Sequence, residues 1–140
     1  MKKPSLAHIE AASRLLAHEG ESAQDAAEAA GRVFEKVHLV LDPILGSPGV
    51  HSLLARSAKM AQSEFARLGG GDVVESASRL REGLRAHGPS DADAAAAALF
   101  GGFLGLLTSL VGTKVTTEVL RRSWPAITIS VENAPEENSQ

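Results

Sequence analysis

The sequence predicts an all-α fold: a single-domain bundle of about five helices around a central apolar helix rich in glycine and alanine. Three observations lead to this prediction. Residues 94–113 form a run of twenty residues without a charged side chain. The segments on either side of the run repeat apolar residues every three or four positions, which is typical of amphipathic helices. Glycine, proline and N-capping residues separate these segments, as they do between consecutive helices.

The composition predicts one globular domain and excludes several kinds of chemistry. A chain of 140 residues, 44% of them hydrophobic, is long enough to bury one core. Its formal net charge of -3 gives no electrostatic bias toward nucleic acid or anionic lipid. Cysteine is absent, so disulfides, thiolate metal sites and thiol chemistry are excluded. Residues 1–4 carry two lysines with no apolar segment behind them, so we expect a cytoplasmic protein.

Two helices are expected in the first third of the chain. The first covers 5–19 and buries one apolar stripe: Leu6, Ile9, Ala12, Leu15 and Leu16. Ser22 and Asp25 resemble a capping box and predict a second helix over 22–45. Its apolar residues recur every three or four positions, as in the seam of a bundle: Ala23, Ala26, Ala30, Val33, Val37, Val40 and Ile44.

A sharp corner is expected where the second helix ends. Pro43 cannot occupy a helix interior without a kink, so the helix should bend or end near this residue. Gly46 fits a left-handed C-terminal cap. Ser47 fits an N-cap and Pro48 the first helical position, so a third helix is expected over 48–68. Its buried series is Val50, Leu54, Ala58, Ala61, Phe65 and Leu68, with Leu53 and Met60 beside it.

Two more helices complete the expected bundle. Asp72 follows a run of three glycines and is expected to cap a fourth helix over 72–87. Its buried series is Val73, Ala77, Leu80 and Leu84. The fifth helix, over 91–123, contains the charge-free run and is expected to kink at Gly112. Beyond the kink its apolar stripe is Val115, Val119 and Leu120.

The charge-free run has two possible environments. A helix that is apolar on all sides is buried in a protein core or spans a membrane, and twenty residues are enough for a span. Residues 94–98 are all alanine and four more residues of the run are glycine, so its lipophilic content is low for a span. Gly101 and Gly105 permit close helix packing in either environment. We expect burial in the core, with a single membrane span over residues 94–113 as the alternative.

The segment after the last helix has the period of a strand. Its alternating apolar residues, together with the tryptophan before them, make a possible interaction segment: Trp124, Ile127, Ile129 and Val131. In one interpretation the segment lies extended over the bundle with Trp124 and Ile127 tucked in. In the other it pairs with the same segment of a second protomer or with an edge strand of a partner protein. Residues 1–125 are expected to form the domain, and 126–140 an extended, flexible and disordered acidic tail.

Parts of the sequence resemble a known group of proteins. The runs 32–68 and 111–125 look like a small all-helical family of uncharacterised bacterial proteins. The more specific features are the Asp-Pro-Ile-Leu-Gly corner at 42–46, Leu-Leu-Ala-Arg at 53–56 and Leu-Arg-Arg-Ser-Trp-Pro at 120–125. The resemblance implies a bacterial helical protein and carries no activity with it.

No residue pattern predicts catalysis, a metal site or a cofactor. Glu35 and His38 have the spacing used in di-iron bundles, but those sites need a second such motif, which the sequence lacks. The serines near His51 are residues that caps and helix surfaces use anyway. The glycine runs lack the preceding strand and the following Lys-Ser/Thr of a phosphate loop. We therefore expect no catalytic residue, no metal and no cofactor.

Nucleic acid is not expected as a partner either. One helix face could carry a basic patch of Arg79, Arg81, Arg85 and His87. Asp72, Glu75 and Glu82 balance these charges within the same expected helix, and no aromatic residue lies between them to stack on bases.

Two functions remain. The first is a non-enzymatic regulatory or protein-interaction module that self-associates or docks a partner helix, because short side chains leave one chain with little core. We accordingly expect a symmetric homodimer. The alternative is a bundle that binds a small apolar ligand in a pocket lined by Met60, Phe65, Phe100, Phe103 and Leu107.

Overall fold

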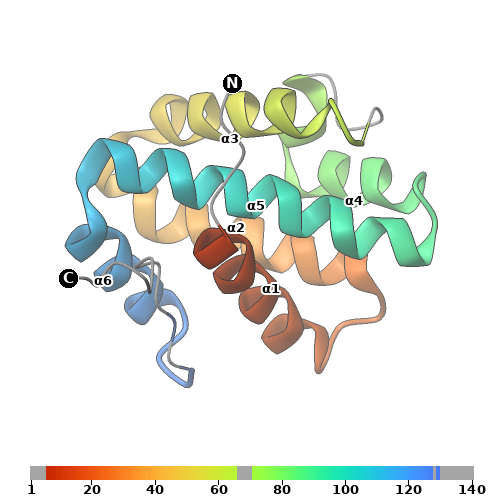
Figure 1. The fold of residues 1–140 in the computed structure, drawn as a ribbon, viewed down its shortest axis with the longest axis horizontal. Helices are drawn as coiled ribbons and strands as arrows, with labels where there is room; N and C mark the ends of the chain where they lie inside the picture. The colour runs from red at the N-terminus through yellow and green to blue at the C-terminus, as the bar shows by residue number, and fades with distance from the viewer. Residues whose placement is uncertain (1–5, 66–70, 128, 130–140) are drawn as a thin grey trace.

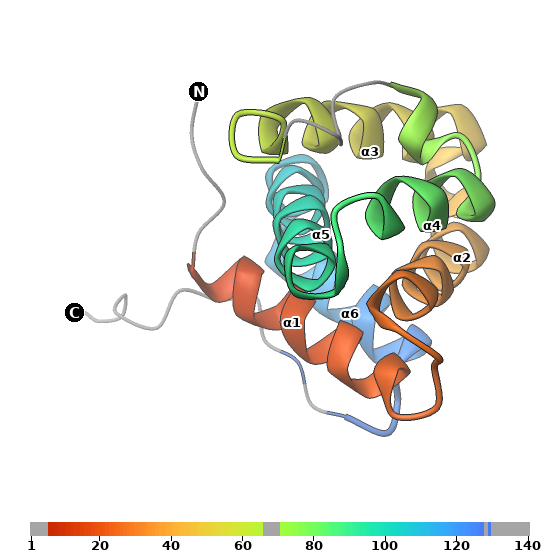
Figure 2. The same ribbon diagram turned by 90° about the vertical axis from the view of Figure 1, so that its right-hand side faces the viewer.

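A computed structural model describes residues 6–65, 71–127 and 129, and within them the fold is all-α. The elements are α1 (Leu6–Gly20), α2 (Ala26–Leu45), α3 (Ser47–Ala61), the 3₁₀ helix η2 (Gly71–Val74), α4 (Ala77–Arg85), α5 (Pro89–Val111) and α6 (Thr113–Ser123). Helix α5 crosses the bundle, and the view almost along it shows α1, α3, α4 and α2 around it (Figures 1 and 2). The predicted bundle around an apolar helix is confirmed.

The core is centred on the middle of α5. Five large side chains of this helix are almost completely buried: Leu99, Phe100, Phe103, Leu104 and Leu107. The principal neighbours of α5 are α1 and α3. By length and composition, Asp91–Val111 could also cross a membrane, and half of this stretch is buried inside the protein. A core helix has the same properties, so the alternative of a membrane span stays untested.

Glycines allow α5 to approach its two main neighbours closely. A methyl group on Gly101 would lie 3.0 Å from Ile9 Cγ1 and 3.1 Å from Ile9 Cα in α1. On another side of α5, a methyl group on Gly102 would overlap the Ser57 hydroxyl of α3. That hydroxyl is buried and donates to the Leu99 carbonyl oxygen at 2.5 Å. The predicted role in close packing is therefore confirmed for Gly101 but not for Gly105, where an added methyl group would make only ordinary contact with His8.

A pair of alanine substitutions separates this packing role from helix propensity. Gly101→Ala is expected to lower the free energy of unfolding by about 1 kcal/mol, because overpacking against the α1 backbone outweighs the gain in helix propensity. Gly105→Ala is the matched control, since its methyl group would meet only His8 Nδ1 at 3.6 Å. This control is expected to be neutral or up to about 1 kcal/mol more stable. Urea unfolding of both variants tests the contrast, and equal effects would contradict it.

The second helix begins later than predicted. Asp25, and not Ser22, is its N-cap: the Asp25 backbone is extended, with φ -156°, and its carboxylate accepts from Glu28 N at 2.8 Å. The Ser22 hydroxyl instead accepts from Arg32 Nη1 at 2.8 Å. The predicted capping box at Ser22 is therefore wrong. Consequently Ala23, expected in the buried seam, lies before the helix.

The corner after α2 has the predicted glycine. Pro43 lies in the last turn of the helix, which ends at Leu45. Gly46 has φ +83°, a conformation that disfavours a side chain, and its N–H donates to Asp42 O at 2.8 Å. The same residue precedes α3, so Ser47 is the first helical residue and not the N-cap.

Two of the longer predicted helices are divided in the structure. The helix predicted over 72–87 consists of η2 and α4. The cap of α4 is Ser76, which accepts from Arg79 N at 3.1 Å, so the predicted cap at Asp72 is wrong. The helix predicted over 91–123 is interrupted at Gly112, whose φ of +92° ends α5 and starts α6. The third helix also ends earlier than predicted, at Ala61.

Four large apolar residues expected to be buried are exposed, and all of them lie near helix ends. Leu6 is 70% exposed, Ile44 49%, Leu110 61% and Val115 41%. The periodicity of these helices is otherwise obeyed, since Leu15, Leu16, Val33, Val37, Val119 and Leu120 are buried. The predicted burial of Leu68 and the predicted disorder of residues 130–140 lie outside the described residues.

Candidate functional site

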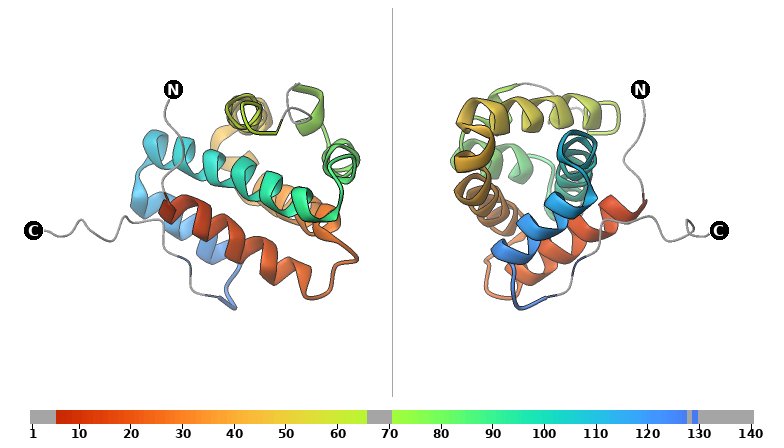
Figure 3. Two further views of the ribbon diagram at one scale, coloured as in Figure 1. Left: turned by 45° about the vertical axis from the view of Figure 1, so that its right-hand side comes forward. Right: turned by 90° about the vertical axis from the view of Figure 1, so that its left-hand side faces the viewer.

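A groove lies between the end of α2 and helix α6. Its volume is about 300 Å³, and it is lined by Ile44, Lys114, Val115, Glu118, Val119 and Arg122. Ile44 and Val115 form its exposed apolar walls, and Val119 is buried beneath them. Figure 3 shows α6 on the outside of the bundle, where its principal neighbours are α5 and α2. We call these six residues the α2–α6 groove.

The charged side chains of the α2–α6 groove all come from one face of α6. Glu118 accepts from Arg121 Nη2 at 2.5 Å, and its carboxylate lies 3.5 Å from Arg122 Nε. The hydrogen bond from Arg121 is the main reason why the pKa of Glu118 is lowered. Lys114 is exposed and has no ion pair among the described residues. The groove therefore combines an apolar floor with charges of both signs at its rim.

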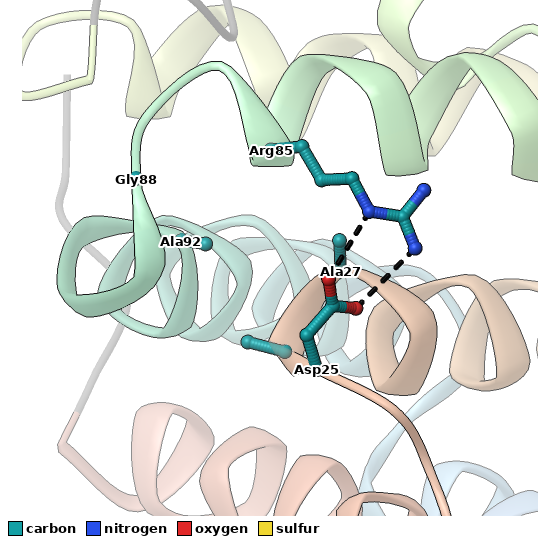
Figure 4. A pocket seen from close by; sticks show the side chains of 6 residues that line it. Asp25, Ala27, Arg85, Gly88 and Ala92 are labelled. Carbon is teal, nitrogen blue, oxygen red and sulfur yellow. Dashed lines mark hydrogen bonds and ion pairs between the residues drawn. The ribbon is translucent and has the colours of Figure 1, made fainter.

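A second cavity, of about 320 Å³, lies where α2, α4 and α5 meet (Figure 4). Its walls are Ala26, Ala27, Gly88 and Ala92, and an ion pair between Arg85 and Asp25 lies at its edge. Arg85 Nε is 3.1 Å from Asp25 Oδ2, and Arg85 Nη2 is 3.4 Å from Oδ1. The hydrogen bond from Arg85, followed by that from Glu28 N, lowers the pKa of Asp25. Both charges are already compensated, so the cavity presents no unpaired group for a ligand.

A largely buried polar cluster joins the first two helices to the end of α6. Trp124 Nε1 donates to Glu19 Oε2 at 2.8 Å, across 105 positions of sequence. Lys36 Nζ donates to the same oxygen and also lies 5.6 Å from the centroid of the Trp124 ring. Glu19 is 6% exposed and Trp124 1%. The cluster connects α1 and α2 to the end of α6. The Glu19 carboxylate accepts hydrogen bonds from both Lys36 and Trp124, which is typical of a structural contact.

The five residues of the predicted apolar pocket do not line either of these two cavities. Phe100, Phe103 and Leu107 are almost fully buried side chains of the core. Met60 and Phe65 are half-buried at the other end of α3 and just beyond it, where Phe65 contacts the His87 ring edge-on at a centroid distance of 6.1 Å. A ligand pocket formed by these residues stays a prediction.

The predicted interaction segment contacts the protein's own core. Trp124 and Ile129 are buried, and Ile127 is half-buried against the core. Val131 lies outside the described residues. Three of the four side chains thus already have partners within the chain, as in the interpretation that tucks the segment in. Pairing with a second protomer stays a prediction.

Two arginines of the candidate basic face, Arg81 and Arg85, pair with carboxylates of α2 and its N-cap. Arg81 Nε lies 2.9 Å from Glu28 Oε1, and Arg85 pairs with Asp25. Among the described residues, no group of three or more His, Asp and Glu side chains could hold a metal ion. Glu35 is largely exposed, whereas His38 lies 3.0 Å from Asp42 and its ring is tilted against that of Phe34 at a centroid distance of 4.7 Å. The structure therefore does not bring Glu35 and His38 together with further ligands.

The sequence does not indicate the α2–α6 groove, because Ile44 and Val115 lie on apolar stripes that predict burial. Their position in the terminal turn of α2 and the first turn of α6 was the available signal, since end turns extend beyond neighbouring helices. Comparison of the chain with known protein families, with curated proteins and with solved structures gives no match. The resemblance to a bacterial helical family stays a prediction, and functional inference depends on the structure alone.

Proposed function

We propose that this chain is a non-enzymatic protein-interaction module that binds its partner through the α2–α6 groove. One observation carries the proposal: Ile44 and Val115 expose apolar surface side by side at a concave place on the bundle. Isolated exposed apolar side chains are common on proteins, but apolar side chains that share a groove with a charged rim are typical of binding sites.

The physical gain comes from covering the apolar walls. Removing apolar surface from water contributes about 25 cal/mol per Å². A partner helix that lays an apolar stripe into the groove would cover Ile44, Val115 and the edge of Val119 together. The charges on α6 would then orient the partner, because rim charges contribute more to specificity and association rate than to affinity.

Site-specific photocrosslinking in the native cell tests the proposal. A photoreactive phenylalanine analogue at Val115 is expected to give a covalent adduct of defined mass. The same analogue at Leu39 is the matched control, because Leu39 is 76% exposed but does not line the groove. Adding Ile44→Asp to the Val115 variant should reduce the adduct at least about tenfold, since a charged wall opposes apolar docking. Equal labelling at both positions, or none at Val115, would contradict the proposal.

A further inference from the structure

The exposed face of α6 carries charges of alternating sign, one helical turn apart. Lys114, Glu118 and Arg122 are spaced by four residues, and all three line the α2–α6 groove. Val115 lies beside this row and is 41% exposed. Two copies of such a row can attract each other when the helices run antiparallel. The copies must then be shifted by one helical turn along the helix axis, so that opposite charges face each other.

Two offsets pair opposite charges, Lys114 with Glu118 or Glu118 with Arg122, and only the first places the exposed Val115 beside the two-fold axis. When two α6 helices run antiparallel about a two-fold axis midway between positions 114 and 118, Lys114 of each copy lies opposite Glu118 of the other. This arrangement forms two equivalent attractive pairs and brings the Val115 side chains together near the axis. Centring the axis on Glu118 instead would oppose two carboxylates and place Lys114 opposite Arg122. Like charges at these positions would oppose association.

We infer that the occupant of the α2–α6 groove is a second copy of this chain, held as a symmetric dimer by antiparallel α6 helices with Lys114 of each copy paired to Glu118 of the other. The inference rests on the proposed function and names its partner. Three observations support it: the free ammonium group of Lys114 among the described residues, the charge order along α6, and the exposed apolar walls of Ile44 and Val115. A two-fold interface uses the same surface on both protomers, so each contact occurs twice.

The test is complementation between two charge-reversed variants. Lys114→Glu places carboxylates opposite carboxylates, and Glu118→Lys places ammonium groups opposite ammonium groups. Each is expected to weaken dimerisation at least about tenfold in light scattering over micromolar concentrations. Mixed in equal amounts, the two variants form heterodimers in which both pairs are attractive, so dimerisation should return to within about threefold of the wild type. The double variant should dimerise likewise.

The controls separate charge pairing from other effects. Lys59→Glu makes the same change in net charge on the exposed face of α3 and should leave the dimer intact. Circular dichroism checks that each variant keeps its helicity, because Glu118→Lys also removes the contacts with Arg121 and Arg122.

Each remaining outcome has one meaning. A wild type that stays monomeric at 100 µM, or single variants that dimerise normally, would overturn the inference, and so would a mixture that fails to restore the dimer. A monomeric wild type whose Val115 adduct contains a different protein would overturn only the second copy as partner and leave the proposed function standing. A monomer without any adduct would overturn both.

Discussion

Replacing Leu104 with aspartate is expected to remove a large share of the stability of this fold. Leu104 lies in the middle of α5 and is 2% exposed, among apolar side chains contributed by several helices. A carboxylate at this position would lose its hydration, and among the described residues no basic side chain is buried to compensate it. The loss of apolar contacts and the unpaired charge together should cost about 4 kcal/mol or more. Single domains have total stabilities of about 5 to 15 kcal/mol, so this loss is a large share.

The matched control is the same substitution on the same helix. Leu110 lies near the end of α5 and is 61% exposed, so Leu110→Asp should change the free energy of unfolding by less than about 0.5 kcal/mol. Thermal and urea unfolding followed by circular dichroism compare the two variants. A Leu104→Asp protein that unfolds at the same midpoint as the Leu110→Asp protein would show that α5 is not the centre of the core.

The sequence was sufficient to predict the central helix because its apolar character is a local property. No charged residue interrupts 94–113, and a segment of this kind must be enclosed, whatever surrounds it. The spacing of Leu80 and Leu84, or of Val33 and Val37, likewise determines which helix face is buried. Periodicity reliably predicts which face of a helix is buried, because it depends only on the geometry of that helix.

Helix ends were harder to predict because two signals competed at the same place. Ser22 with Asp25 and Asp25 with Glu28 both have the spacing of a capping box, and only packing decides between them. At Gly112 the sequence predicts a kinked helix, but the backbone φ of +92° makes it a break. Terminal turns raise a related problem, because periodicity does not show how far a neighbouring helix extends. Ile44 and Val115 are therefore exposed although they lie on predicted apolar faces.

The candidate groove and the polar cluster could not be predicted from the sequence for a different reason than the helix ends. Each joins residues that are far apart in sequence, such as Ile44 with Val115 and Glu19 with Trp124. Neither pair forms a recognisable sequence motif, because the two residues come together only through the packing of α1, α2 and α6. Glu19 is the last residue of the helix predicted over 5–19, and a charged residue at a helix end is usually solvated. Only the tertiary structure shows that it is a buried acceptor.

Removing the Glu19 carboxylate is expected to loosen the contact between the end of α6 and the first two helices. Glu19→Ala leaves the buried Trp124 N–H without its acceptor and removes the partner of Lys36, whose partly exposed side chain can turn to water. The expected loss in free energy of unfolding at pH 7 is about 2 to 4 kcal/mol. Glu19→Gln keeps an oxygen for Trp124 but no charge for Lys36, so its loss should be smaller, about 1 to 2 kcal/mol.

The same contact predicts a defined dependence on pH. Burial by itself would raise the pKa of Glu19, but hydrogen bonds from Lys36 and Trp124, with the charges of Lys36 and His18, outweigh it and lower the pKa. The folded protein therefore binds this proton less tightly than the unfolded chain does. The contribution of the carboxylate to stability is complete above the unfolded pKa of about 4.3 and is lost as the pH falls through the lower folded value.

The measurement is the difference in free energy of unfolding between wild type and Glu19→Gln, taken from pH 7 down to pH 3. Trp124 is the single tryptophan of the chain, so its fluorescence reports the unfolding of this contact directly. The difference should be constant from pH 7 to about pH 5 and shrink below about pH 4.3. Glu10→Gln, on the exposed face of α1, is the control and should show little difference at any pH. A Glu19→Gln difference that is zero at pH 7, or that grows as the solution is acidified, would mean that the carboxylate does not hold Trp124 in place.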